Sequence, residues 1–167
     1  VLAGAETEAE RLLMLSAEAG LPARRLSVNH AFHTPAVAEA VEVLRDVGAN
    51  FVGRQPERTW ISSFTGRPVE EISADYWVSH AIQPVRFGDA LACAGGSGLG
   101  LAVELGVRTL TGAALRILPE STCVVPLLDA GHGAQAFLRA LATAEAAGHE
   151  VDWGPENQRP TRSPRPV

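Results

Sequence analysis

The fold class is indicated by residues 101–147, which read LAVELGVRTLTGAALRILPESTCVVPLLDAGHGAQAFLRALATAEAA. Short apolar runs at 101–105 and 122–128 are typical of buried strands, whereas the segment at 111–118 and the alanine-rich segment at 134–147 are predicted to be helices. Strands that alternate with helices are the pattern of α/β proteins. The stretch therefore predicts an α/β fold.

The residues before this stretch continue the alternation. Gly20 and Pro22 end the first helix, because glycine permits a left-handed cap and proline lacks a backbone donor. Thr34 and Pro35 are a favourable cap and first residue for the second helix. A flexible glycine-rich loop is expected at 95–100. The sequence predicts helices at residues 6–19, 35–48, 75–78 and 85–94, and strands at residues 25–29 and 60–64.

The composition excludes several classes of protein. The chain has 167 residues, 46% of them hydrophobic, and its 14 Lys and Arg against 19 Asp and Glu give a formal net charge of −5. This length fits one domain or part of a larger one, and the acidic balance disfavours a partner such as nucleic acid or a membrane surface. The sequence contains no apolar run of the roughly 20 residues that cross a membrane, and its N-terminus lacks the basic region of a signal peptide. Cys93 and Cys123 have neither metal-ligand spacing nor a disulfide framework, so we expect a cytoplasmic protein.

Candidate chemistry lies at residues 29–35, Asn-His-Ala-Phe-His-Thr-Pro, where a predicted strand ends and a helix begins. His33 could act as a general base or acid, because imidazole titrates near neutral pH. Alternatively His30 and His33 could form half of a metal site, although the chain has no cysteine-rich or acidic cluster beside them. The histidines that could complete such a site are His80, His132 and His149. A third interpretation is a hydrogen-bonded structural histidine. The residues alone leave these interpretations open.

The segment HAFHTP at 30–35 resembles the HAFHSP motif of acyltransferase domains in modular type I polyketide synthases. Four further matches follow in the order of that family, and together they cover about residues 1–153. They are TGRPV at 65–69, DYWVSH at 75–80 with PVRF at 84–87, ELG at 104–106 and VDW at 151–153. A single match of this kind has little weight, whereas an ordered set is a strong signal.

The resemblance implies a two-step acyl transfer. In the family, a serine attacks an acyl-CoA thioester while the motif histidine removes its proton, and the same histidine later activates the phosphopantetheine thiol of an acyl carrier protein. Carried onto this chain, His33 is the catalytic base, and the main-chain carbonyl at His80 holds its other nitrogen. The resemblance implies that the segment itself binds no cofactor or metal, and that its partners are malonyl-CoA, the carrier protein, and the ketosynthase and other domains of the synthase.

The resemblance also assigns substrate selectivity to His30 and Phe32. Domains of the HAFH type tend to take malonyl units, whereas YASH-type domains take methylmalonyl units. A phenyl ring at position 32 would crowd an α-methyl group, a difference worth about 1–3 kcal/mol for one methyl. The alternative is that Phe32 packs in the core.

The chain departs from the family in lacking a Gly-x-Ser-x-Gly nucleophile; its nearest look-alikes are at 96–98 and 131–133. The arginine that binds the malonyl carboxylate in the family is also expected upstream, and Val107 replaces the proline after ELG. We therefore expect the C-terminal part of an α/β-hydrolase-like acyltransferase. Its predicted parts are a partial ferredoxin-like small subdomain (1–28), the C-terminal part of the large subdomain (29–128), a post-acyltransferase linker (129–153) and a disordered tail (154–167).

Two alternatives to the acyltransferase stay open at this point. The chain could be a catalytically silent, truncated or linker fragment, because half a sheet leaves strand edges and apolar faces uncovered. It could also be a different α/β enzyme that combines His33 with a nucleophile from another chain.

Overall fold

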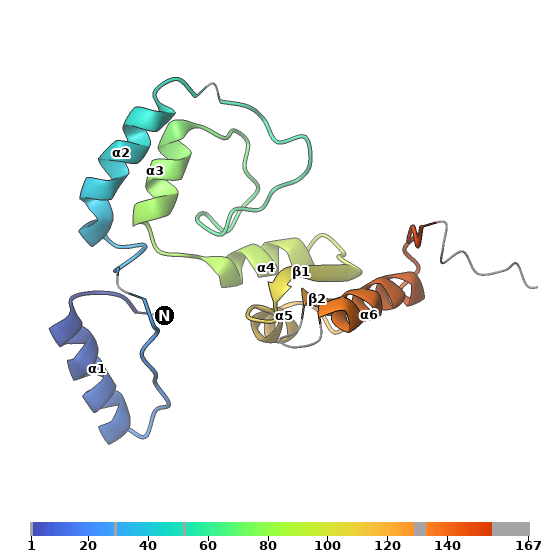
Figure 1. Ribbon diagram of the computed structural model, residues 1–167, viewed down its shortest axis with the longest axis horizontal. Coiled ribbons are helices and arrows are strands. Elements are labelled where there is room, and N and C mark those ends of the chain that lie inside the picture. Colours follow the sequence, from blue (N-terminus) through green and yellow to red (C-terminus); the bar gives the residue numbers. More distant parts are fainter. Residues whose placement is uncertain (1, 29, 52, 129–132, 155–167) are drawn as a thin grey trace, which may run out of the picture. The chain divides into compact units, whose positions relative to one another are not determined.

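A computed structural model describes residues 2–28, 30–51, 53–128 and 133–154 (Figure 1). The chain divides into two compact units, Val1–Ala94 and Gly95–Val167. The predicted divisions after residues 28 and 128 stay predictions, and residues 155–167 of the expected tail lie outside the described part of the chain.

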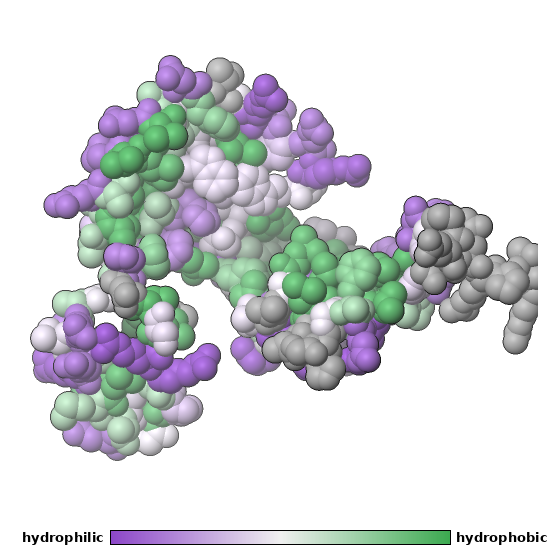
Figure 2. Space-filling model, in the orientation of Figure 1, coloured by the Kyte–Doolittle hydropathy of each residue, from purple (hydrophilic) through white to green (hydrophobic). Residues whose placement is uncertain are grey.

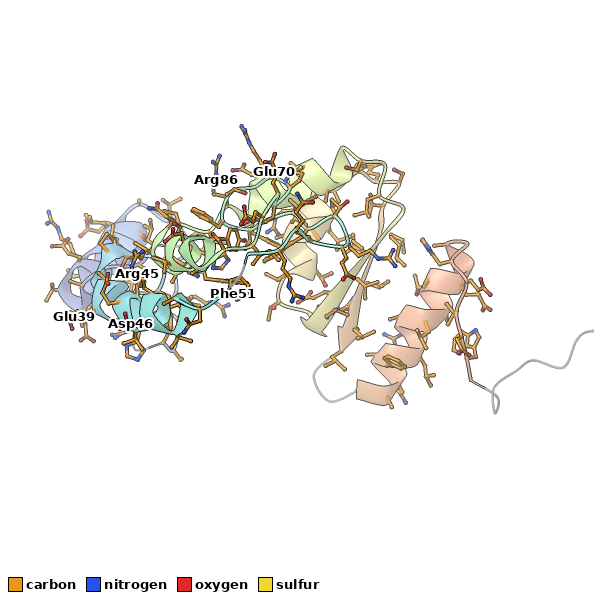
Figure 3. The ribbon with its side chains drawn as sticks, turned by 90° about the horizontal axis from the view of Figure 1, so that it is seen from above. Glu39, Arg45, Asp46, Phe51, Glu70 and Arg86 are labelled. Atoms are coloured by element: carbon orange, nitrogen blue, oxygen red, sulfur yellow. The ribbon has the colours of Figure 1, made fainter. Side chains whose placement is uncertain are left out.

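The first unit is built from helices. They are α1 (Glu6–Glu18), the short 3-10 helix η1 (Pro35–Val37), α2 (Ala38–Gly48), α3 (Ala74–Ile82) and α4 (Phe87–Gly95), of which α4 ends at the boundary. Helices α2 and α3 lie side by side (Figure 1), and Val41 and Val78 are buried on them. Arg45 of α2, labelled in Figure 3, pairs with Asp75 of α3 at 3.0 Å. The packed helices thus bury one valine each and are joined by an ion pair.

Two predicted strands of the first unit are absent from the structure. Residues 25–28 form no strand, because no described segment supplies the hydrogen-bonding partner that a strand requires; Asn29 lies outside the described residues. Within 60–64 a single antiparallel bridge joins Ile61 to Pro68. The chain turns back at once after this bridge, since the amides of Phe64 and Thr65 donate to the Ser62 hydroxyl at 3.0 and 3.2 Å. The prediction of strands at these two places is therefore wrong.

The second unit contains a strand–helix–strand–helix sequence, β1 (Leu101–Val107), α5 (Thr111–Ile117), β2 (Cys123–Leu128) and α6 (Gly133–Ala146). The two strands pair in parallel, with Leu101 opposite Cys123, and the register shifts between Glu104 and Val107. Helix α6 packs on β2 through small side chains, and its alanines 136 and 140 are buried. The parallel strands, joined through a helix, confirm the predicted α/β class.

Apolar side chains are also exposed on both units. Figure 2 shows apolar surface over α2, where Val43 and Val47 are exposed, and over the second unit, where Phe137 and Leu138 are exposed. Helix α1 buries none of its side chains among the described residues. Contiguous apolar surface of this kind is typical of faces that pack against another segment or protein.

The connection from β1 to α5 is held by the Glu104 carboxylate. One oxygen, Oε1, accepts hydrogen bonds from the amides of Thr109 (2.7 Å) and Leu110 (2.9 Å) and from the Thr109 hydroxyl (3.0 Å). The other, Oε2, accepts from the amide (2.7 Å) and hydroxyl (2.6 Å) of Thr111, the first residue of α5. Burial acts to raise the pKa of Glu104, but the hydrogen bonds from the Thr111 hydroxyl and from the amides of Leu110, Thr109 and Thr111 outweigh burial and lower the pKa from 4.5 to about 2. The ionised carboxylate thus satisfies backbone donors at the start of the helix.

Replacing Glu104 by Gln is expected to lower the free energy of unfolding by about 1 kcal/mol at neutral pH, because the charge-assisted hydrogen bonds are lost. The folded-state pKa lies below the unfolded value, so this stabilisation is present above about pH 4.5 and is lost as the pH falls towards about 2. Thermal unfolding measured across this range should show the wild type and E104Q converging at low pH. The exposed Glu120→Gln is the control, and an E104Q difference that does not change with pH would contradict the assignment.

The turn after Ser62 requires glycine at position 66. Gly66 has φ +71°, and a Cβ at this position would lie 2.6 Å from the Cβ of Asp89. Gly98 has a similar φ of +74°, yet no atom lies within 4 Å of the place that a Cβ would take there. The two glycines therefore share the cost of a left-handed backbone and differ in the steric clash.

Gly98→Ala is expected to destabilise the protein by about 1 kcal/mol, because an L side chain strains a backbone at positive φ. Gly66→Ala is expected to cost about 1–3 kcal/mol more, since the added methyl group also forces the turn away from α4. Chemical denaturation of both variants measures the difference. Equal losses of unfolding free energy in the two variants would contradict this expectation, because the turn would then move away from Asp89 without cost.

Candidate active site

The site is centred on His33, which lies directly before η1. Thr34 caps η1: its hydroxyl accepts from the amide of Ala36 at 3.2 Å and donates to the carbonyl of Ala31 at 2.7 Å. His33 has φ 60°, a left-handed conformation that non-glycine residues adopt infrequently. Backbone strain of this kind concentrates at functional sites, where it fixes the direction of a side chain.

His33 reaches across to α3. Its Nδ1 lies 3.0 Å from the main-chain carbonyl oxygen of His80, 47 residues further along the chain. A carbonyl oxygen can only accept, so Nδ1 carries the proton and Nε2 of the neutral ring keeps its lone pair. The half-buried imidazole is therefore held as a proton acceptor at Nε2. The structure thus brings together the two residues that the sequence analysis paired.

The His80 side chain packs among aromatic rings. Its ring lies 5.7 Å from that of His33, centroid to centroid, and its Nε2 lies 3.4 Å from the Ser63 hydroxyl. Burial, and secondly the positive charge that His33 can acquire, lower the pKa of His80. Three more aromatic rings lie around the His80 ring, with 6.0–6.3 Å between ring centroids. They belong to Phe64, Tyr76 and Trp77.

Helix α3 is longer than predicted and is fixed by its neighbours. It continues to Ile82, and the Ser73 hydroxyl caps it by accepting from the amide of Tyr76 at 3.1 Å. Ser62 is fully buried, and its hydroxyl lies 2.7 Å from the Tyr76 hydroxyl. The turn at 65–68 is therefore tied to the helix that carries His80. Sequence reasoning did not single out Ser62 or Ser63, and their position directly before the TGRPV turn is the signal that could have indicated them.

His30 and Phe32 lie beside the base in sequence. Their rings meet edge to face, 5.6 Å between centroids. Phe32 is 54% exposed, so it is not part of the core formed by the described residues. The alternative in which Phe32 is a core residue is therefore not supported, and the selectivity role of both residues stays a prediction.

The structure describes only some of the residues of the other predicted sites. Among the described residues, no three His, Cys, Asp or Glu side chains gather as a metal site would require. His132 lies outside the described part of the chain, as does most of the 131–133 look-alike. No described helix has both the length and the apolar character needed to cross a membrane.

Comparison with known proteins identifies relatives over most of the chain. No family model matches it. The polyketide synthase GfsA of Streptomyces halstedii is 34% identical over 160 residues, which cover 92% of this chain and 2% of that synthase. The phenolphthiocerol synthesis polyketide synthase type I Pks15/1 of Mycobacterium marinum is 31% identical over 160 residues, which cover 92% of this chain and 8% of that synthase. The chain spans a small part of the length of each relative.

Solved structures show which part of a synthase is matched. The acyltransferase domain from the second module of the salinomycin polyketide synthase is 36% identical to this chain, and the two structures superimpose with a TM-score of 0.83. The match covers 92% of this chain and 38% of that domain. The acyltransferase domain from module 8 of the same synthase is 27% identical, with a TM-score of 0.82 over 90% of this chain and 37% of that domain. A malonyl-CoA:acyl carrier protein transacylase from Xanthomonas oryzae shares the fold at 23% identity, with a TM-score of 0.68 over 81% of this chain and 44% of that protein.

The matched positions, the parallel α/β unit and the ordered motifs agree with one another. The chain therefore belongs to the acyltransferase domains of modular polyketide synthases, and it represents part of one such domain.

Proposed function

We propose that this segment supplies the catalytic base for the transfer of an acyl unit from acyl-CoA to an acyl carrier protein. The observation that supports it is the hydrogen bond of His33 Nδ1 to the His80 carbonyl, because this contact leaves Nε2 as a proton acceptor. Membership of the acyltransferase family supports the choice of reaction.

In the first half of the proposed reaction, Nε2 of His33 takes the proton of a serine hydroxyl while the serine oxygen attacks the thioester carbonyl. The carbon–sulfur bond breaks, and the imidazolium returns the proton to the leaving thiolate of coenzyme A. The His80 carbonyl stabilises the imidazolium through Nδ1–H, as the acid does in a catalytic triad. This sequence holds no Gly-x-Ser-x-Gly motif, so we assign the serine to residues outside it.

In the second half, the phosphopantetheine thiol of the carrier protein gives its proton to Nε2, and its sulfur attacks the acyl ester. The serine then leaves and recovers the proton. The same imidazole thus serves both halves, which explains why the site holds one fixed tautomer. The carrier protein and the other domains of a synthase, including the ketosynthase, are the proposed partners, and the segment needs no cofactor of its own.

We further propose that malonyl is the preferred acyl unit. Phe32 adjoins the base, is exposed, and has its ring supported edge-on by His30. A ring held there would crowd the α-methyl group of methylmalonyl more than the hydrogen of malonyl. The expected discrimination is about 1–3 kcal/mol, the range for one methyl group in a pocket.

A second candidate function is a catalytically silent fragment that acts only through its surfaces. The exposed apolar side chains of α1, Met14 and Leu15 among them, favour this alternative, because a protein that works alone tends to cover such residues. The two candidates differ in whether His33 is needed for acyl transfer.

His33→Ala, made in the complete acyltransferase domain, is expected to lower malonyl transfer to the carrier protein by about 10²–10⁴-fold, because general-base assistance is lost. Loading from malonyl-CoA, followed by mass spectrometry of the carrier protein, measures the rate. The matched control is the exposed His149→Ala, which should transfer at the wild-type rate. Equal rates for both variants would favour the silent fragment.

Phe32→Ser is expected to narrow the preference for malonyl over methylmalonyl by about 10–100-fold in kcat/KM, because the methyl group gains room. Competition between the two acyl-CoA substrates gives this ratio directly. Phe51, labelled in Figure 3, is another exposed phenylalanine of the first unit, and Phe51→Ser should leave the ratio unchanged. An unchanged ratio in Phe32→Ser would overturn the selectivity proposal and leave the role of His33 intact.

A further inference from the structure

The carbonyl that holds His33 belongs to a helix, where carbonyl groups ordinarily have partners. Inside an α-helix each carbonyl accepts a hydrogen bond from the amide four residues later, and this pattern stops only where the helix ends. The carbonyl of Ser79 follows this rule and accepts from the amide of Gln83 at 2.9 Å. The next carbonyl is that of His80, and its partner would be the amide of residue 84.

Residue 84 is a proline, which has no N–H group. The ring also restricts the residue before it to extended backbone, and Gln83 has φ −79° and ψ 152°. Helix α3 therefore ends at Ile82, and the chain turns towards Ser63, whose carbonyl accepts from the amide of Arg86 at 2.6 Å. The helix supplies no donor to the His80 carbonyl.

We propose that Pro84 is a positioning residue that keeps the His80 carbonyl free for the Nδ1–H of His33. The carbonyl would otherwise lie in the hydrogen-bond ladder of α3, directed along the helix axis and shared with a backbone donor. A shared carbonyl is a weaker acceptor for the imidazole, so His33 would lose its preference for the tautomer with the proton on Nδ1. The catalytic consequence rests on the function proposed above, whereas the tautomer itself does not.

The proposal assigns the effect to one missing N–H group, so it can be separated from the loss of the proline ring. Pro84→Ala restores an N–H and lets α3 continue. An ester analogue with lactic acid at position 84 has the same methyl side chain as alanine but no N–H. Gln83→Ala changes a side chain at the adjacent position and leaves the backbone donors as they are.

The first readout is the tautomer of His33, measured in the 167-residue chain by NMR of nitrogen-15-labelled imidazole. Wild type, Gln83→Ala and the ester analogue are expected to carry the proton on Nδ1, whereas Pro84→Ala is expected to show a mixture of both tautomers. A wild-type tautomer in Pro84→Ala would overturn the proposal. An equal loss of the Nδ1-protonated tautomer in Pro84→Ala and in the ester analogue would also overturn the proposal, because the proline ring and not the missing N–H would then be responsible.

The second readout is acyl transfer by the complete domain. Pro84→Ala should lower kcat about tenfold with KM unchanged, the effect of one weakened hydrogen bond to a charged intermediate, and the ester analogue should recover the rate. A Pro84→Ala rate equal to the wild-type rate would overturn the catalytic consequence. If the tautomers behave as expected but His33→Ala still transfers acyl groups, the proposed function fails and the role of Pro84 in holding the imidazole stands.

Discussion

The hydrogen bond between His33 Nδ1 and the His80 carbonyl is the contact on which the site depends. It needs three features: a left-handed backbone at His33, a helix 47 residues further along that presents its third-last carbonyl, and, shortly after that helix, a residue that cannot donate. The contact fixes one tautomer in return. An imidazole that rotates freely would populate both neutral tautomers, with the proton on either ring nitrogen, and several ring orientations.

The surroundings of α3 explain how such a contact persists in a small unit. Ser62, at zero exposure, bonds the Tyr76 hydroxyl and two amides of its own turn, and none of the buried side-chain polar atoms in the described residues lacks a partner. Hydrogen bonds in a partly buried setting are strong when complete and costly when incomplete, so a satisfied network resists distortion. The aromatic rings around His80 pack beside this network. The helix is thereby fixed along its length, and its free carbonyl stays aimed at His33.

The predictions of secondary structure differ in success for a physical reason. Residues 101–107 and 123–128 form strands because each supplies the other's hydrogen-bond partners in parallel register. Residues 25–28 alternate polar residues with Leu26 and Val28, but no described segment pairs with them. At residues 60–64, the turn formed by Ser62 and Gly66 bends the chain after one bridge at Ile61. Strand propensity describes a local preference, whereas a strand exists only with a neighbour.

Three features could be predicted from the amino-acid sequence alone: the alternation of helices and strands in the second unit, the position of His33 directly before a helix cap, and the ordered motifs that indicate the family. These features are local, so apolar spacing, capping residues and short motifs encode them. Three features follow only from the three-dimensional fold: the left-handed backbone of His33, the anchoring of α3 by Ser62 and Ser63, and the contact of the His80 carbonyl with the imidazole of His33. Each of these depends on which groups meet across the fold, and a one-dimensional pattern contains no distances between residues such as His33 and His80.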